Sequence, residues 1–225
     1  MRNLLAACGF FLLIHFGVSG TRLRDSLVRR LGEKPYRGLF SLASLGGMAW
    51  LIAAYREAPY IATWGQWLAF RPAAYGLVFV AFLFAVIGLL TPSPTQVGME
   101  SRLDPAGARG MTRITRHPFL WGVALWSATH LLVNGDVASL VLFGSFLVLA
   151  LGGTVSIDAK RRRRYGGTWR AFAAATSNVP FAALRRGSNR LAPALAQIGL
   201  WRPLMAIALF AIAFYLHGRL GHPLH

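Results

Sequence analysis

The sequence predicts an all-α protein, a polytopic bundle of about six transmembrane helices with a basic amphipathic segment between the fifth and the sixth. Hydrophobic residues make up 55% of the 225-residue chain and charged residues only 14%, whereas soluble domains carry about 25% charged residues. The apolar residues form runs near the length of about 20 residues that a helix needs to cross a bilayer. The 24 Lys and Arg residues, against 7 Asp and Glu, lie between these runs. We expect a single integral membrane domain over residues 1–225.

Six apolar segments, some of them short, are predicted to span the membrane. In chain order they are residues 3–20, 38–55, 73–91, 119–133, 137–157 and 200–217. Only Asn134-Gly135-Asp136 separates the fourth from the fifth, and these residue types favour turns. We therefore expect a tight antiparallel hairpin in which Asp136 serves the turn.

The first apolar segment has a cleaved signal peptide as its alternative interpretation. Its basic start consists of Arg2 alone, and its apolar stretch contains His15. A signal peptide would also export the six basic residues that follow it. A retained helix is therefore the better prediction.

The distribution of Lys and Arg predicts the orientation. The connections that follow the first, third and fifth segments hold 20 of the 24 basic residues. The positive-inside rule places these three connections in the cytoplasm and both termini outside, as for a protein of the bacterial inner membrane. Anionic membrane lipid is then the expected partner of the basic loops, and nucleic acid is not.

The connection between the fifth and sixth segments, residues 158–203, is too long for a simple loop in a compact domain. Aromatic and aliphatic residues alternate in it with cations, which is typical of segments that lie at the lipid headgroups. We expect Arg161–Arg164 to act as a stop-transfer and lipid-anchoring cluster. The apolar members of the connection are Trp169, Phe172, Val179, Phe181, Leu184 and Leu191.

Histidines in apolar segments are the candidate functional residues, because ionisable groups inside a membrane are costly. His15 has no carboxylate near it in the sequence, and neutral imidazole is a good ligand of haem iron. The alternative is a histidine that hydrogen-bonds to a neighbouring helix. Three histidines near the C-terminus are expected to lie at the membrane interface and to have no functional role. They are His217, His222 and His225.

His117 and His130 belong to one predicted helix but cannot bind one metal ion together. They are 13 residues apart, so they point about 220° apart around the helix and are about 20 Å apart along it. One of them would have to pair with His15. Depth in the membrane favours His117, but helix tilt could reverse that preference, so the partner stays open.

The sequence contains few residues that could support other cofactor or acid–base chemistry. Cys8 is the only cysteine, so the chain has neither an internal disulfide nor a cysteine zinc site, and no Cys-x-x-Cys-His would attach haem covalently. The seven carboxylates all fall in connections or at segment ends. They are too few for acid–base pairs inside the membrane.

Several motifs together resemble the NnrU family of membrane proteins, whose plant relatives are the 15-cis-zeta-carotene isomerases. The resemblance covers about 180 residues in order. The motifs are His15-Phe-Gly-Val-Ser-Gly20 with Arg22 and Arg24, Tyr36-Arg37-Gly-Leu-Phe40-Ser41-Leu42, Thr112-Arg113-Ile114-Thr115-Arg116-His117-Pro118, Gly122, Leu125-Trp126-Ser-Ala-Thr-His130-Leu131, Asn134-Gly135-Asp136, Tyr165-Gly166 to Trp169, and Thr176-Ser177-Asn178-Val179-Pro180-Phe181.

The resemblance implies a haem b protein in the membrane. In the isomerase branch, haem iron acts on a conjugated polyene and rotates a cis double bond without net redox change. The bacterial branch is associated with nitrite and nitric oxide reduction, so a lipophilic or a small gaseous ligand would be expected. The resemblance suggests His15 and His130 as axial ligands, keeps His117 as a third candidate, and adds Arg116 and Trp126 as cofactor-binding residues.

A second resemblance concerns the C-terminal half alone and implies a different reaction class. Arg116-His117-Pro118-x-x-x-Gly122, followed by Tyr165-Gly166 and Pro180, is similar to membrane methyltransferases of isoprenylcysteine and phospholipids, which use S-adenosylmethionine. The chain departs from that pattern at Leu120 and at Asp158-Ala159, which indicates a shared scaffold. A non-enzymatic membrane assembly factor is the third hypothesis, so the sequence leaves open whether the protein is an enzyme.

Overall fold

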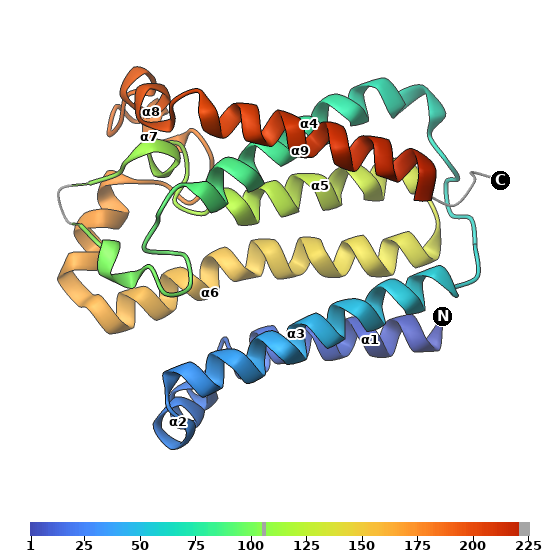
Figure 1. Ribbon diagram of the computed structural model, residues 1–225, viewed down its shortest axis with the longest axis horizontal. Helices are drawn as coiled ribbons and strands as arrows, with labels where there is room; N and C mark the ends of the chain where they lie inside the picture. The colour runs from blue at the N-terminus through green and yellow to red at the C-terminus, as the bar shows by residue number, and fades with distance from the viewer. Residues whose placement is uncertain (105–106, 221–225) are drawn as a thin grey trace. The chain divides into compact units, whose positions relative to one another are not determined.

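The protein is a set of α-helices (Figure 1). The computed structural model describes residues 1–104 and 107–220, is 77% helical and has no strand within those ranges. This confirms the predicted all-α class. His222 and His225 lie outside the described residues.

Six long helical stretches match the six predicted segments. They are α1 (Arg2–Leu12), which a π-helical segment η1 (Leu13–Val18) continues, α3 (Glu33–Arg56), α4 (Arg71–Leu90), α5 (Pro118–Asn134), α6 (Val137–Ala175) and α9 (Trp201–Leu220). The shorter helices are α2 (Arg22–Leu31), α7 (Ala182–Arg185) and α8 (Leu191–Ile198), with 3-10 turns η2 at Leu68–Phe70, η3 at Glu100–Arg102 and η4 at Gly110–Arg113.

Among the described residues, four helices are long and apolar enough to cross a membrane, namely α3, the stretch 68–90 that contains α4, α6 and α9. A fifth span is added if α1, η1 and α2 count as one bent unit. Helix α5, at 17 residues, is at the lower end of spanning lengths, about 17–25 residues. The protein is therefore an integral membrane protein of several helices.

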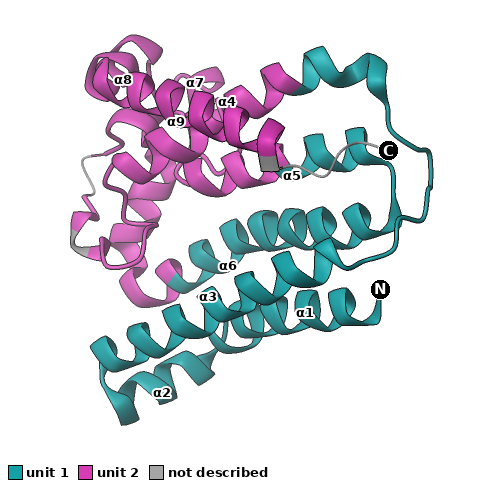
Figure 2. Cartoon of the chain, turned by 45° about the vertical axis from the view of Figure 1, so that its right-hand side comes forward, with its two compact units in different colours: residues 1–74, 127–160 teal, residues 75–126, 161–225 magenta. Residues whose placement is uncertain are grey.

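The chain forms two compact units, each built from two separate stretches of sequence (Figure 2). Unit 1 comprises residues 1–74 and 127–160, and unit 2 comprises residues 75–126 and 161–225. The boundaries fall inside α4, α5 and α6.

In unit 1, glycines allow close approach of the helices around α1. A Cβ atom at Gly47 of α3 would lie 3.1 Å from the Phe10 ring, and one at Gly152 of α6 would lie 2.7 Å from the Phe16 ring. Near the start of α1, the Trp50 indole donates a hydrogen bond of 2.8 Å to the Asn3 side chain. Small residues at such contacts are typical of helix packing in membranes.

The connection between α5 and α6 is the tight turn that the sequence predicts. Gly135 has φ of 58°, and a side chain there would collide with the Gly65 carbonyl. The Gly135 carbonyl accepts hydrogen bonds from the backbone N–H groups of Thr63 and Gly65, at 2.9 and 3.1 Å. Asp136 caps α6, because its carboxylate accepts the Ser139 N–H at 2.9 Å. The expected turn role of Asp136 is confirmed.

In unit 2, α4 and α5 meet at two glycines. A Cβ atom at Gly88 would lie 2.8 Å from the Phe119 backbone nitrogen, and one at Gly122 would lie 2.7 Å from the Ala81 carbonyl oxygen. Arg202 ties two helix ends together, donating to the carbonyls of Leu90 and Ile198 at 3.0 and 2.6 Å. The buried core beside them contains Ile87, Met111, Ile114, Ala194, Ile198 and Ala206.

The structure corrects two predictions about the connection 158–203. Helix α6 continues to Ala175, with a break in its backbone geometry at Gly166 (φ 50°, ψ −117°). Trp169 and Phe172 are only 1% and 2% exposed, so they belong to a folded interior and do not lie among headgroups. Val179, Phe181 and Leu191 are exposed, as the prediction requires.

Arg161 is likewise not a free lipid anchor. Its guanidinium donates to the Pro94 and Gln96 carbonyls at 2.9 and 3.3 Å and pairs with Glu100 at 3.0 Å. Only 13% of its side chain is exposed. The three arginines that follow, Arg162–Arg164, are exposed, so the anchoring prediction stays open for those three.

Candidate functional site

His15 lies in the π-helical segment η1, directly after α1. The Ser19 N–H donates to the Ile14 carbonyl at 3.0 Å, a five-residue spacing that widens the helix. Short π-helical turns inside helices occur frequently at functional sites. The sequence does not predict the π-helical segment η1, although two glycines, Gly17 and Gly20, follow His15.

The His15 ring is held in one orientation. Its Nδ1 lies 2.7 Å from the Phe11 carbonyl oxygen, and because a carbonyl only accepts, Nδ1 is the donor. In the neutral ring, Nε2 then carries the lone pair. Histidines that bind metals commonly donate their other ring nitrogen in this way, which fixes the tautomer.

Two aromatic rings contact His15, one from α1 and one from α3. Its centroid is 4.4 Å from that of Phe11 and 5.3 Å from that of Phe40 on α3. Phe11 in turn contacts Phe146 on α6 at 5.9 Å. His15 therefore lies among apolar rings, and its side chain is half-buried.

His130, on α5, belongs to the same unit as His15 and contacts α6 directly. Its ring stacks on Phe143 at 4.6 Å with an interplanar angle of 24°. Phe143 and Phe146 are three residues apart, which is about 4.5 Å along a helix. The ring contacts of His15, through Phe11, and those of His130 thus reach one turn of α6.

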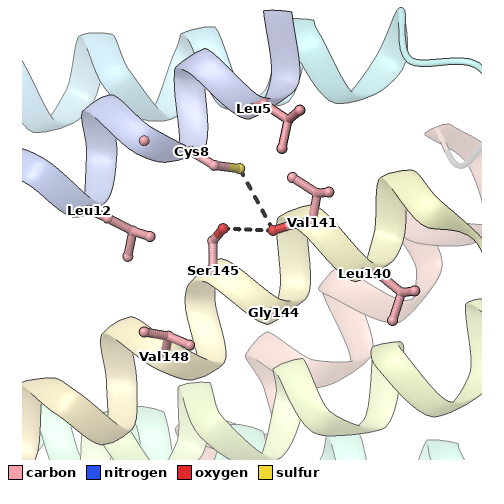
Figure 3. Close-up of a pocket in the computed structure, with 9 residues that line it drawn as sticks. Leu5, Cys8, Leu12, Leu140, Val141, Gly144, Ser145 and Val148 are labelled. Atoms are coloured by element: carbon pink, nitrogen blue, oxygen red, sulfur yellow. Dashed lines mark hydrogen bonds between the residues drawn. The ribbon is translucent and has the colours of Figure 1, made fainter. Parts of the chain in front are cut away.

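A groove lies between α1 and α6 in unit 1, with a volume of about 400 Å³ (Figure 3). Its floor carries two polar groups, the Cys8 thiol at 3.8 Å and the Ser145 hydroxyl at 2.6 Å from the Val141 carbonyl. A Cβ atom at Gly9 or Gly144 would meet nothing within 4 Å, so glycine leaves both walls open. The lining residues are Leu5, Cys8, Gly9, Leu12, Leu140, Val141, Gly144, Ser145 and Val148.

The groove is apolar apart from its floor, and its α1 wall ends at Leu12, three residues before His15. An extended hydrocarbon chain is the kind of ligand that such a surface suits, since it offers no charged group and few hydrogen-bond partners. The sequence does not predict this groove. The only signal was the recurrence of small residues, Gly9 and Gly144, on two apolar helices.

His117 is in unit 2, at the start of α5, and is 2% exposed. The segment before it is held by hydrogen bonds to the segment 177–178. Thr115 donates its hydroxyl to the Asn178 carbonyl at 2.5 Å, and the Arg116 N–H donates to the Ser177 carbonyl at 2.9 Å. Two motifs that are distant in the sequence therefore meet in one polar cluster.

The two predicted cofactor-binding residues are in unit 2 as well. Arg116 is half-buried, and its carbonyl accepts the Thr95 hydroxyl at 2.6 Å. Trp126 is half-buried on α5. The structure thus brings His15 and His130 into one unit, and His117, Arg116 and Trp126 into the other.

No group of three or more His, Cys, Asp or Glu side chains lies close enough to hold a metal ion within residues 1–104 and 107–220. A haem needs at most two axial side chains, so its requirement differs from that of a bare ion. His15, with Nδ1 donating and Nε2 carrying the lone pair, has the donor chemistry of such a ligand. The residues present fit a haem in this respect.

Helices of spanning length and a histidine set among aromatic rings define a helical membrane protein with a candidate site for a prosthetic group. Comparison with known proteins identifies the family. The NnrU family model matches residues 3–223, so the chain belongs to the NnrU family.

Two curated relatives are chloroplastic 15-cis-zeta-carotene isomerases. The chain is 26% identical to the one from Arabidopsis thaliana over 218 residues and to the one from Zea mays over 222 residues, 95% of this chain in each case. It spans 58% of the length of each relative. No solved structure matches.

Proposed function

We propose that this protein binds haem b in unit 1, where His15 and His130 would hold it, and that it isomerises a double bond in a lipophilic polyene. The observation that carries the proposal is the His15 ring, held by the Phe11 carbonyl with Nε2 as its lone-pair nitrogen. The named relatives support the isomerase part, because they are 15-cis-zeta-carotene isomerases that cover 95% of this chain.

His130 is preferred to His117 as the second ligand. His15 and His130 share unit 1, and the ring contacts of both lead to Phe143 and Phe146 on one turn of α6. His117 belongs to unit 2, where its backbone N–H donates to the Thr115 hydroxyl at 3.3 Å. The resemblance that names His15 and His130 agrees with this choice.

The side chains of unit 1 would have three tasks. His15 and His130 would hold the haem, whose iron would supply a centre able to exchange electron density with a conjugated double bond. Phe11 and Phe40 would exclude water and restrict the rotation of the His15 ring. The groove lined by Leu5, Leu12 and their neighbours would admit the hydrocarbon chain of the substrate from the bilayer.

We further propose that the protein resides in a bacterial inner membrane with both termini outside the cytoplasm. The support is the excess of basic residues in three alternate connections. The exposed arginines Arg162–Arg164 and the exposed residues of α2 are part of that excess. This orientation places the groove, which lies on the early part of α1 and of α6, in the outer half of the membrane.

The test is an ultraviolet–visible spectrum of the detergent-purified protein, oxidised and then reduced with dithionite. We expect a Soret band with α and β bands that sharpen on reduction, as for low-spin haem. His15→Ala and His130→Ala should each abolish the low-spin spectrum. His117→Ala should keep it, and so should His217→Ala, a control on α9.

Three outcomes would contradict the proposal. A His15→Ala variant that retains full low-spin haem removes His15 as a ligand. A protein that stays colourless after haem loading, yet binds S-adenosylmethionine in a manner that requires Arg116 and His117, would favour the methyltransferase hypothesis. A colourless protein that binds neither but co-purifies with another membrane protein would favour the assembly factor.

A further inference from the structure

Helix α2 follows the first membrane helix after a sharp bend. The axes of the stretches 2–18 and 22–31 differ by 78°, and Thr21 forms the N-cap between them, accepting the Leu23 N–H at 3.2 Å. In Figure 1, α2 lies at the end of α1 and α3. A charged residue at the centre of a spanning helix costs about 2.5–3.5 kcal/mol, so α2, in which five of the ten residues RLRDSLVRRL are charged, is not itself part of the span.

The bend sets the direction of α2 relative to the bilayer. If α1 stands upright in the membrane, a helix 78° away from it lies about 12° from the membrane plane. Spanning helices commonly tilt by about 20°, which leaves α2 within about 30° of that plane. At this angle α2 would run along the membrane surface.

The residues of α2 divide into two faces. At about 100° per residue, Leu23, Leu27, Val28 and Leu31 fall within an arc of about 140°, and Arg22, Arg29 and Arg30 occupy a separate arc of about 100°. Arg24 is the one cation inside the apolar arc. Leu23 and Leu31 are 50% and 46% exposed. No residue of α2 is buried, so the protein does not cover the apolar face completely.

One arginine of α2 is committed to the protein itself. Arg24 pairs with Glu33 at 2.8 Å and lies over the Tyr36 ring at 5.6 Å. Glu33 also pairs with Arg37 at 3.0 Å. These contacts hold α2 against the start of α3 and leave the three arginines of the polar face for another partner.

The three remaining arginines have no carboxylate partner within the described ranges. Arg22, Arg29 and Arg30 are exposed, as is Lys34 just beyond them, and the Arg29 guanidinium donates only to the Ser26 hydroxyl of the same helix, at 3.0 Å. A surface with this charge complements anions. Since α2 continues a membrane span and exposes leucines as well, the anions that fit are those of lipid headgroups.

We propose that α2 is an interfacial helix that binds anionic phospholipid, with Leu23, Leu27 and Leu31 inserted at the acyl boundary and Arg22, Arg29 and Arg30 at the phosphates. The proposal is independent of the haem. Each basic residue near an anionic surface is worth about fivefold in binding. Loss of three should therefore reduce the preference for anionic lipid by well over fivefold.

The first experiment measures lipid preference on the full-length protein, equilibrated with a mixture of phosphatidylcholine and phosphatidylglycerol and analysed by native mass spectrometry. We expect phosphatidylglycerol to be enriched, and the triple variant R22Q/R29Q/R30Q to lose most of that enrichment. The matched control is R2Q/R56Q/R219Q, which removes three exposed arginines elsewhere and should keep it. Equal enrichment in the α2 triple variant and the wild type would overturn the proposal.

A second measurement covers the case in which the triple variant fails to fold. In a Cys8→Ser background, an environment-sensitive fluorophore is attached to Leu23→Cys or to Asp25→Cys, one on each face, and the protein is reconstituted in phosphatidylglycerol-containing vesicles. We expect lipid-chain nitroxides to quench the label at position 23 severalfold more than that at 25. Equal, weak quenching at both positions would show α2 in water, overturning the proposal and pointing to an acidic protein as the partner.

Discussion

Helix α2 and the segment 161–175 at the end of α6 are alike in sequence and different in structure. Each mixes arginines with aromatic or aliphatic residues, and each follows an apolar stretch. Yet α2 buries no residue, whereas the segment 161–175 holds Trp169 and Phe172 at 1% and 2% exposure and an arginine, Arg161, at 13%. A basic amphipathic pattern therefore does not by itself indicate a surface-lying segment.

The difference in burial comes from the hydrogen-bond acceptors that lie near each segment. Arg161 finds two backbone carbonyls, of Pro94 and Gln96, and the Glu100 carboxylate, all in the loop after α4. Such a set of acceptors satisfies a guanidinium away from water. The polar face of α2 meets no comparable loop within the described residues, so its arginines stay exposed.

Truncation of the buried aromatic residue should produce the largest difference between the two segments. Trp169→Ala removes a side chain that is 1% exposed, and such changes cost about 3–5 kcal/mol. Leu23→Ala on α2 should cost less than about 0.5 kcal/mol in detergent, because the side chain is half exposed. Unfolding in mixed detergent micelles measures both. Equal losses would mean that the two segments are packed alike.

Removal of Arg161 should have an intermediate effect. Arg161→Ala leaves the Glu100 carboxylate and two carbonyls without this donor, which should cost about 2–3 kcal/mol in unfolding free energy. Arg162→Ala, one residue further along and exposed, is the control and should change stability by less than about 0.5 kcal/mol. Arg161→Lys should recover only part of the loss, because an ammonium cannot reproduce the planar fork. A neutral Arg161→Ala would restore the lipid-anchor interpretation of this residue.

The ion pairs that hold α2 should have the smallest effect. Arg24→Gln removes the contact with Glu33, whose side chain is 36% exposed, and exposed pairs contribute about 0.2–1 kcal/mol. The loss should shrink further in 1 M salt, where the screening length is about 3 Å. Thermal unfolding of wild type and variant at low and high salt provides the measurement. A salt-independent loss as large as that of Arg161→Ala would show that α2 is packed as tightly as the end of α6.

In the candidate site, too, some properties follow from the residue type and others only from the structural environment. His15 is conspicuous in the sequence as an ionisable residue in an apolar run, and its chemistry as a ligand could be anticipated. The Phe11 carbonyl that orients it and the π-helical turn that carries it could not, since both depend on backbone geometry. Depth along the helices favoured His117 as its partner, whereas ring contacts in unit 1 favour His130.

Hydrophobic composition and the placement of cations determined that this is an all-α membrane protein and roughly where its helices run. The residue types of Asn134-Gly135-Asp136 determined that a turn joins α5 to α6. These properties depend on the local cost of placing polar groups in lipid, which each segment carries in its own residues. The tertiary structure alone decided that Arg161, Trp169 and Phe172 are interior, that the chain bends at Thr21 between η1 and α2, and that a groove opens beside Gly9 and Gly144. Each of these depends on which residues distant in the sequence come into contact, and composition and periodicity carry no record of that.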